Sequence, residues 1–499
     1  MVLADRTGLM DILRKPAFYV ALIAVCLSLL MLGHRGTWDP DEGRYTNVGL
    51  NMLDSGDWLN PKRNEEIGHW TKPPMTYWAI GASVAMFGTN PWAARLPSAL
   101  SYLLCVWLVW RMARRLAPGS EATAALAFAT MLVPIGAAQY ITTDFLLTAF
   151  STFAMHGFVQ ARFGDTHRRW WIATLWIGFG LAFLTKGPPT LLPLLGVVAF
   201  DLLSPGAQRP RVFGWSALLF PVVALPWYLA VVRENPGLLE HFLGSEVIAR
   251  VASDDFARHG EWYGFLVVYV PTLLLGTLPW TPALLRWCRT LPATVRGWRT
   301  PTQRAADAPG LLLALWIALP LLVFCLARSR MPLYLLPLFA PLALLVGLQR
   351  LREGRASVRW AWIAAWVAIV LALQLGLGFW RTHKDASVWA DEIRRRAGGQ
   401  PVHEVVFVED MTRYGLHLEL GLSTHIEKIA LYPVPQSKFD RVYDELLEQE
   451  LDEHEAGAIW ICKAGTFPQV LARVRAAGHE ASPLGAPWQG RTFFRVSRR

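Results

Sequence analysis

The chain is poor in charge and in cysteine. Only 17% of its 499 residues are Asp, Glu, Lys or Arg, whereas 53% are hydrophobic and 24 are Trp. Soluble domains usually carry about 25% charged residues, so this composition argues against an ordinary soluble protein. The five cysteines are scattered along the chain, four of them in or beside apolar runs. No disulfide framework is therefore indicated.

The chain is instead rich in long apolar runs. Runs of about 17 to 25 apolar residues, the length that crosses a bilayer, occur at about eleven places, several of them interrupted by Pro. Their centres lie near Ala24, Leu104, Ala127, Phe150, Trp176, Leu195, Val223, Leu274, Trp316, Leu338 and Ala368. No small-residue cleavage pattern follows the first run, so we expect a retained span and not a signal peptide.

The arginines predict an orientation. If the N-terminus with Arg6, Arg14 and Lys15 is cytoplasmic, every second loop also carries arginine, as the topology rule requires. An odd number of spans then places the C-terminus on the outer side. The formal charge of +10 is spread over these short loops and forms no single patch, so we expect no nucleic-acid partner.

The chain changes character near Lys384. Strand-like runs such as "EVVFVED" and "AIWICK" alternate with the helix-like "FDRVYDELLEQEL". This pattern predicts a small α/β domain of about a hundred residues. The acidic run "YDELLEQELDEHE" is typical of a solvated helix face, and we expect no active-site residue in this domain.

The first outer loop contains the stretch "TWDPDEGRY". Asp39 as N-cap, Pro40 at the first helical position and Gly56 beyond the end predict a short helix over residues 41–54. Tyr45, Val48, Met52 and Leu53 share one side of that helix, which predicts that it lies along the membrane surface. Asp41 and Glu42 have a purely structural interpretation, since acids suit the first turn of a helix.

Further ionisable groups fall on the predicted outer side. Each alone can be a snorkelling anchor at the end of a span. Positive charge on the outer side, however, is what the topology rule disfavours, and an anionic ligand there would explain it, with Lys as a point charge and Arg as a clamp on phosphate. The groups are Lys72, Asp144, Lys186, His259, Glu261, Arg328 and Arg330.

An ordered set of motifs carries a resemblance. "DPDEGRY", "SGDW", "KPPMTYW", "FGTNPWAARLPSAL", "LTKGPP" and "ARSRMPLYLLP" occur in this order between Trp38 and Pro337. In these motifs the chain resembles the bacterial branch of the dolichyl-phosphate-mannose protein mannosyltransferase family, which includes the lipid A aminoarabinose transferases. The C-terminal segment carries no matching motif.

The resemblance implies a fold and a location. It implies a type C glycosyltransferase, an all-α polytopic membrane protein with about eleven to thirteen transmembrane helices and a small C-terminal periplasmic α/β domain. The transmembrane domain would cover residues 1–383, with its first periplasmic loop at 34–75, and the periplasmic domain would cover 384–499. The protein would be multi-pass in the bacterial inner membrane, with its N-terminus cytoplasmic.

The resemblance also implies an activity. The donor would be a sugar on polyprenyl phosphate, with no nucleotide cofactor, and the acceptor lipid A or another envelope glycan. Asp41 would be the catalytic carboxylate and Glu42 its neighbour. Because the leaving group is already an anion, one general base and fixed cations suffice, and this predicts inversion at the anomeric carbon. The donor phosphate would be held by Arg44, Tyr45, Lys72, Lys186, Arg328 or Arg330, and Tyr334.

A metal site and two other functions stay open. In the aminoarabinose transferases an acidic residue before the motif lysine is implicated in metal binding, whereas Thr71 stands in that place here. Asp144 and His259 are the tentative ligands of a divalent ion, and His69 lies near this lysine in the sequence. Transfer to a protein hydroxyl is an equal alternative. A lipid-linked-sugar transporter would predict mid-span charges and internal repeats, and neither is evident.

Overall fold

The computed structural model describes residues 15–64, 66–164, 167–204, 210–244, 258–355, 357–453 and 457–498. Arg6 and Arg14, used for the predicted orientation, lie outside these residues. By its internal contacts the chain divides into two compact units. The first comprises Met1–Met31 and Ser98–Leu375, and the second comprises Leu32–Pro97 and Gly376–Arg499. The second unit therefore joins the first predicted loop to the C-terminal segment.

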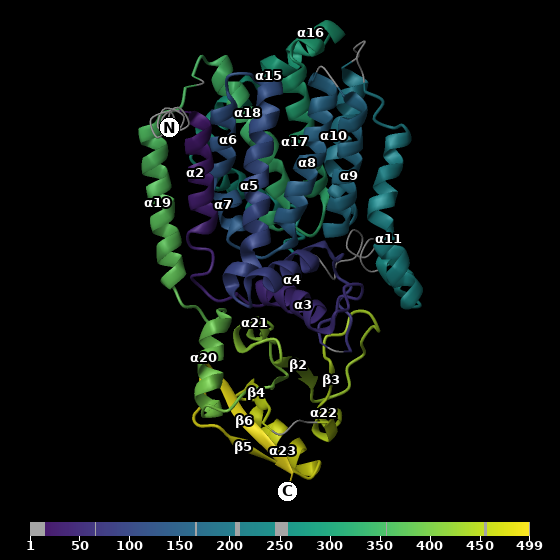
Figure 1. Cartoon of the computed structure of the whole chain (residues 1–499), viewed down its shortest axis with the longest axis vertical. Coiled ribbons are helices and arrows are strands. Elements are labelled where there is room, and N and C mark those ends of the chain that lie inside the picture. Colours follow the sequence, from purple (N-terminus) through teal and green to yellow (C-terminus); the bar gives the residue numbers. More distant parts are fainter. Residues whose placement is uncertain are drawn as a thin grey trace, which may run out of the picture. The chain divides into compact units, whose positions relative to one another are not determined.

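The first unit is helical (Figure 1). Its apolar side chains form one continuous core. All five cysteines are unpaired, as the sequence indicates. In chain order its elements are α2 (Pro16–Leu29), α5 (Pro91–Leu116), α6 (Glu121–Thr130), α7 (Leu132–Ala138), α8 (Thr143–Phe163), α9 (Arg168–Lys186), η1 (Pro188–Leu191), α10 (Leu192–Leu203), η2 (Trp215–Leu218), α11 (Leu219–Glu234), α12 (Leu238–His241), α14 (Gly264–Gly276), α15 (Thr281–Gly297), α16 (Pro301–Ala306), α17 (Ala308–Leu326), η4 (Pro332–Leu338), α18 (Phe339–Arg352) and α19 (Trp360–Phe379). The start of α5, up to Pro97 and including Arg95, and the end of α19, from Gly376, belong to the second unit.

Several of these helices can cross a bilayer. Within the described ranges, five helical segments are long and apolar enough, and the number rises to seven if each of two bent pairs is one span. The bends are 60° between α6 and α7 and 117° between α14 and α15. Shorter apolar helices, such as α2, add to the set. The chain is thus a helical membrane protein, as its composition predicts.

The bend between α6 and α7 is held by tryptophan side chains. Met131 has an extended backbone there, with φ −68° and ψ 136°, so the end of α6 needs new hydrogen-bond partners. Trp280 donates its Nε1–H to Thr130 Oγ1 at 2.8 Å, and Trp366 donates its Nε1–H to the Thr130 carbonyl at 2.9 Å. The break is therefore stabilised by apolar residues that carry a single polar group.

In the second unit, α3 (Asp41–Ser55) packs against α4 (Met75–Phe87). Gly56 ends α3 in the left-handed conformation with φ 70°, and the helix predicted over 41–54 is confirmed. The N-cap prediction is wrong, because Pro40 is the N-cap and the Asp39 side chain bonds elsewhere. The predicted position on the membrane surface is also not supported, because Val48 and Met52 are buried within the protein.

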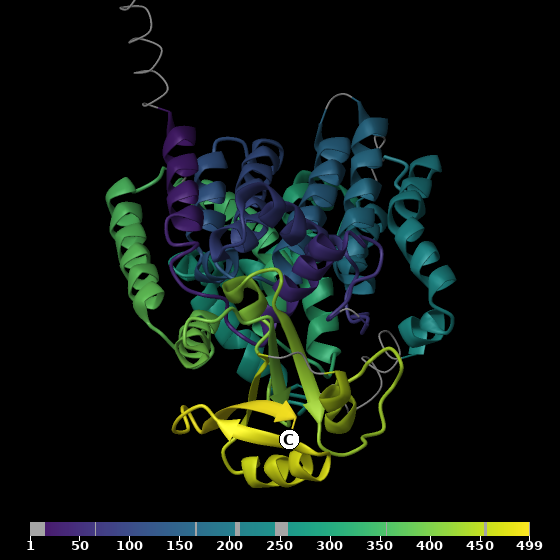
Figure 2. The same ribbon diagram turned by 60° about the horizontal axis from the view of Figure 1, so that its bottom comes forward.

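The C-terminal part of the second unit is a mixed sheet with helices, as the alternating pattern predicts (Figure 2). The strand order is β3-β2-β1-β4-β6-β5; β1 is parallel to β2 and β4, β3 is parallel to β2, and β6 is antiparallel to β4 and β5. The elements are α20 (Ala386–Ala397), β1 (Glu404–Val408), α21 (Leu416–Leu420), β2 (His425–Ala430), β3 (Glu445–Leu446), α22 (Leu447–Glu453), β4 (Ile459–Lys463), α23 (Phe467–Ala476), β5 (His479–Pro483) and β6 (Arg491–Arg498).

The acidic run departs from its prediction. In the part of the run that the structure describes, up to Glu453, only α22 is helical, and residues 439–444 precede a short strand. Asp444 and Glu450 are 2% and 4% exposed, so the run is not wholly a solvated face. Asp444 is buried because Arg63, from the first predicted loop, pairs with its carboxylate. A local acidic pattern could not reveal so distant a partner.

Candidate active site

Asp41 opens α3 and carries the accessible carboxylate of its first turn. Its side chain is 38% exposed, and its Oδ1 accepts a hydrogen bond at 2.9 Å from Nη2 of Arg44, one turn further along. Pro40 before it and the α3 backbone after it fix its direction, since Arg44 N–H donates to the Pro40 carbonyl at 3.1 Å. The structure thus brings together the predicted base and one predicted phosphate ligand.

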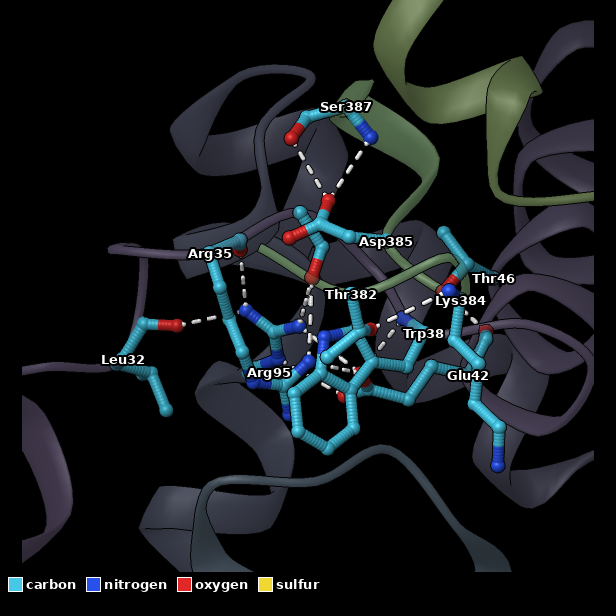
Figure 3. Close-up of polar contacts among 11 residues, drawn as sticks. Leu32, Arg35, Trp38, Glu42, Thr46, Arg95, Thr382, Lys384, Asp385 and Ser387 are labelled. Atoms are coloured by element: carbon cyan, nitrogen blue, oxygen red, sulfur yellow. Dashed lines mark hydrogen bonds and ion pairs between the residues drawn. The ribbon is translucent and has the colours of Figure 1, made fainter. Parts of the chain in front are cut away.

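Glu42 is adjacent in the sequence but fully buried (Figure 3). Its carboxylate accepts hydrogen bonds from Arg35 Nη1 at 2.5 Å, Arg95 Nε at 2.8 Å and the Trp38 N–H at 2.9 Å. Burial alone would raise its pKa, but the two guanidinium groups outweigh burial and lower the pKa to about 2. Glu42 is therefore a fixed anion that anchors the start of α3.

Asp39 is the second buried carboxylate of this stretch, 1% exposed. Its Oδ1 accepts the Gly415 N–H at 3.1 Å, from the C-terminal part of the unit. Burial raises the pKa of Asp39 to about 7, although the Gly415 N–H and the Arg413 charge oppose the increase. Sequence reasoning missed both partners, and the only available signal was a third acid in "DPDE".

Aromatic and basic side chains surround the start of α4. The rings of Tyr45 and Tyr77 stack with centroids 6.1 Å apart, and the guanidinium carbon of Arg44 lies 5.3 Å from the Tyr45 ring centroid. Lys72 Nζ donates to the Thr71 carbonyl at 2.7 Å. These residues place three of the predicted phosphate ligands, Arg44, Tyr45 and Lys72, within the second unit.

His69 is buried in this part of the second unit. Its Nε2 lies 2.9 Å from Thr71 Oγ1, at the position where the resemblance implies an acidic residue. Burial and the charges of Arg44, Arg63 and Lys72 hold the pKa of His69 well below its usual range. His69 is therefore a neutral hydrogen-bonding residue at neutral pH.

Asp144, Lys186 and Tyr334 form a second group, in the first unit. Asp144 lies in the first turn of α8, which Thr142 caps, and Lys186 is the last residue of α9. Lys186 Nζ lies 2.5 Å from Asp144 Oδ1 and 4.6 Å from the Tyr334 ring centroid. Both charged side chains are largely buried, at 9% and 13% exposure. The sequence predicted all three as site residues but not their mutual contact.

Arg328, Arg330 and His259 differ in their surroundings. Arg330 is 4% exposed, and its guanidinium donates to the backbone carbonyls of His259 at 2.5 Å and Glu261 at 2.7 Å. Arg328 and the His259 side chain are exposed. Arg330 therefore ties two segments of the first unit together, and of the two arginines Arg328 is the accessible one.

The described residues contain no ligand set that fits the tentative metal site. Within the described ranges, no group of three or more His, Cys, Asp and Glu side chains could hold a metal ion. Asp144, the predicted ligand, has its carboxylate in an ion pair with Lys186.

Comparison with known proteins adds a family and a fold. A family model described as dolichyl-phosphate-mannose-protein mannosyltransferase matches residues 71–229. An undecaprenyl phosphate-alpha-4-amino-4-deoxy-L-arabinose arabinosyl transferase of Pseudomonas fluorescens (strain Pf0-1) is 33% identical over 340 residues, 66% of this chain and 59% of the relative. A transferase of the same name from Pseudomonas aeruginosa (strain UCBPP-PA14) is 32% identical, over 69% of this chain and 62% of the relative.

The chain thus spans about 60% of the length of these relatives. The crystal structure of ArnT from Cupriavidus metallidurans bound to undecaprenyl phosphate has a TM-score of 0.74 at 20% identity, covering 96% of this chain and 97% of that one. At this identity the likeness shows a shared fold, helical with a small C-terminal sheet. The matches together confirm that the chain resembles the bacterial branch of the dolichyl-phosphate-mannose protein mannosyltransferase family.

Proposed function

We propose that this protein is an inverting glycosyltransferase that moves a single sugar from a polyprenyl-phosphate donor to lipid A or another envelope glycan. One observation carries the proposal. Asp41 is accessible and ion-paired with Arg44 at 2.9 Å, while Asp39 and Glu42 on either side are buried. Of the three acids in this stretch, Asp41 is available for chemistry, whereas Asp39 and Glu42 hold the surrounding chain in place.

The chemistry needs one base. Asp41 accepts the proton of the incoming acceptor hydroxyl as that oxygen attacks the anomeric carbon, and the bond from this carbon to the donor phosphate oxygen breaks. The phosphate leaves as an anion, so no acid is required to protonate it. Attack from the face opposite the leaving group inverts the anomeric configuration, by analogy with inverting glycosidases.

The phosphate needs fixed cations. Arg44 and Lys72, both in the second unit, supply positive charge for the donor phosphate, which gains charge as the bond breaks. Lys186 and Arg328, in the first unit, keep the role of donor-phosphate ligands that the resemblance implies. Tyr45 and Tyr334 are the aromatic residues beside these cations, each next to a cationic side chain. Arg330 is less suited to this role, because backbone carbonyls already occupy its guanidinium.

The proposed function also has a location. We place the protein in the bacterial inner membrane with the N-terminus cytoplasmic and about eleven to thirteen spans, consistent with the alternating arginines. Residues 34–75 and the domain at 384–499 are then periplasmic, and residues 1–383 contain the transmembrane domain. The donor and acceptor are both lipid-linked on this side, so the bilayer itself delivers them.

A purified assay tests the catalytic assignment. The protein is incubated with an undecaprenyl-phosphate-linked sugar and an envelope lipid extract, and the transferred sugar is measured by mass spectrometry. Asp41→Asn should lower kcat by at least about a hundredfold, the usual cost of losing a general base. The matched control is Asp54→Asn, an exposed acid at the other end of α3 that should retain the rate.

The acceptor is identified in cells. Envelope lipids, glycans and periplasmic proteins of cells lacking the protein are compared with those of cells restored with wild type or with Asp41→Asn. A single-sugar increment that only the wild type restores supports the proposal, and its carrier distinguishes a lipid or glycan from a protein hydroxyl. Full restoration by Asp41→Asn would overturn the assignment of the base.

A further inference from the structure

The chain just before α3 is paired with the C-terminal part of the same unit. The Asp39 N–H donates to the Lys384 carbonyl at 2.9 Å, and the Ala386 N–H donates to the Thr37 carbonyl at 2.9 Å. Between these bonds, Trp38 and Asp385 form an antiparallel bridge. Figure 3 draws Trp38, Lys384 and Asp385 together beside Glu42. The residues leading into the candidate base thus form a short two-stranded ladder with residues 384–386.

The side chain of Asp39 adds a second attachment. Its Oδ1 accepts the Gly415 N–H, whereas its Oδ2 has no hydrogen-bond partner among the described residues. The charge of Arg413, itself 2% exposed, favours the ionised form of Asp39. The Arg413 guanidinium carbon lies 3.9 Å from the Trp389 ring centroid, and its Nε and Nη1 have no hydrogen-bond partner within the described ranges. A buried carboxyl group and a buried guanidinium group thus influence each other electrostatically at this junction.

The backbones approach so closely that only glycine fits. A Cβ on Gly43, in the first turn of α3, would overlap Asp39 Oδ1 and the Gly415 nitrogen. A Cβ on Gly415 would overlap Thr37 Oγ1 and lie 2.7 Å from the Ala386 Cβ. A contact below 3.0 Å forces one of the two groups to shift. Here the opposing Gly415 nitrogen belongs to the backbone, and the opposing Ala386 Cβ belongs to a short side chain. The junction therefore has little room to move.

We propose that Asp39, Arg413 and Gly415, here called the Asp39 latch, are positioning residues through which the C-terminal segment sets the place of Asp41. This inference rests on the proposed function and adds residues that its chemistry does not itself use. The Trp38 carbonyl accepts the Glu42 N–H and the Pro40 carbonyl accepts the Arg44 N–H, both at 3.1 Å. Because of these two hydrogen bonds, a displacement of the chain just before α3 would also displace the first turn of α3.

Position matters at this step because a displacement of about 1 Å can cost about a hundredfold in rate. Asp41 has no buried anchor of its own, since within the described ranges its carboxylate pairs only with Arg44 on the same turn. Glu42 fixes the helix start toward Arg35 and Arg95, and the latch fixes it toward the C-terminal segment. Loss of either attachment leaves the turn held from one direction only.

The latch also predicts a pH signature. Asp39 faces Glu42 on α3, Asp385 on the paired strand and Arg413 on the segment before α21; the first two raise its pKa and the third lowers it. Arg413 is in turn influenced by Asp410 and Arg491. With a pKa of about 7, Asp39 ionises within the range where the enzyme can be assayed. The ionised carboxylate accepts the Gly415 N–H more strongly and attracts Arg413, so kcat should rise with pH through this value.

The test uses the full-length protein and four variants. Gly415→Ala forces the junction apart, Asp39→Ala removes the acceptor, and Asp39→Asn keeps an acceptor of the same shape that does not titrate. Gly465→Ala, at a glycine of the same C-terminal segment with open space around it, is the matched control. The readouts are kcat and KM for the undecaprenyl-phosphate-linked sugar, the pH profile of kcat, and the melting temperature.

The latch predicts a specific pattern. Gly415→Ala and Asp39→Ala should lower kcat by about tenfold or more while the donor KM changes by less than about threefold, because transition-state geometry is lost and ground-state binding is not. Asp39→Asn, which is uncharged at every pH, should keep kcat near the level of the wild type at low pH and lose the inflection near pH 7. Gly465→Ala should match the wild type in every readout.

Two results would overturn the latch alone. One is a wild-type kcat in folded Gly415→Ala and Asp39→Ala protein. The other is a rate that falls only in proportion to the folded fraction, with the pH inflection unchanged in Asp39→Asn; this would make the contact merely structural. If Asp41→Asn retains full activity, the assignment of Asp41 as the base fails and the latch fails with it. If the wild type transfers no sugar, the proposed function itself fails, and both outcomes are distinct from the first two.

Discussion

Arg95 holds Glu42 through two parallel hydrogen bonds, from Nε to Oε1 at 2.8 Å and from Nη2 to Oε2 at 2.9 Å. Both side chains are essentially inaccessible to solvent. The remaining Arg95 donor, Nη1, binds the carbonyls of Leu32 and Arg35 at 3.0 and 2.9 Å. One guanidinium thus fixes the end of the segment before α3 and the first turn of α3 itself. These contacts explain why the Glu42 carboxylate is buried, whereas the carboxylate of its neighbour Asp41 is accessible.

Removal of the Glu42 charge should destabilise the second unit. Glu42→Gln leaves the Arg95 guanidinium buried without its counter-ion, and breaking a buried pair in this way usually costs about 3–5 kcal/mol. We expect a clear fall in the melting temperature of the detergent-solubilised protein. Asp54→Asn, on the exposed end of the same helix, should melt like the wild type. A melting temperature of Glu42→Gln equal to that of the control would show that the pair does not stabilise the unit.

Asp39 and Glu42 should give opposite pH dependences of stability. Glu42 has a folded-state pKa of about 2 against an ordinary 4.5, so its contribution is present above pH 4.5 and is lost as pH falls through about 2. The pKa of Asp39 is raised from 3.8 to about 7, so its contribution is present below pH 3.8 and is lost as pH rises through about 7. Of these two residues, only Asp39 therefore changes its contribution to stability between pH 4.5 and about pH 7.

The measurement is the difference in melting temperature between wild type and Asp39→Asn across the interval from about pH 4 to about pH 8. Because the asparagine does not titrate, the wild type should lose stability relative to the variant as pH rises. A difference that stays constant over this interval would contradict the raised pKa. The comparison cancels all other titrating groups that the two proteins share.

Local features of the site were predictable from the sequence. Pro40 and Gly56 bracket α3 through backbone preferences that act within a few residues, and the helix was therefore predicted almost to its last residue. The cations of the candidate site are predictions from a related pattern. Lys72 and Lys186 stand out because the predicted topology places them on the outer side, where positive charge is disfavoured.

Long-range partners were not predictable in this way. Gly415 bonds to Asp39 across 376 residues of sequence, and Arg95 binds Glu42 across 53. Neither contact produces a periodicity or a residue spacing that could be recognised in the sequence. Arg95 gave one usable hint, since an arginine inside the apolar motif "FGTNPWAARLPSAL" requires a buried counter-ion. The same limitation explains why the acidic run near Glu450 was taken for a solvated face.

Lys186 and Asp144 should behave as a coupled pair. Lys186→Met leaves the Asp144 carboxylate, 9% exposed, without its cation, and this should cost about 3–5 kcal/mol of stability. Lys186→Met combined with Asp144→Asn removes both charges and should recover most of that loss while transfer stays defective. The check is a double-mutant cycle on melting temperature with kcat and donor KM measured in parallel. Additive losses in the double variant would show that the two groups act independently.

Removal of divalent ions should leave the transferase rate unchanged. Lys186 is ion-paired with the Asp144 carboxylate at 2.5 Å, so this carboxylate is not available to a metal ion. Arg44 and Lys72 can stabilise the phosphate without a bound cation, so a chelator should remove nothing that the reaction needs. The measurement is the rate after treatment with EDTA and dialysis, with metal content confirmed by mass spectrometry, and we expect a change of less than about twofold. Addition of Mg²⁺, Mn²⁺ or Zn²⁺ should then not raise it. A large loss that one cation alone restores would contradict the prediction, and Lys186→Met would then test whether the freed Asp144 binds that ion more tightly.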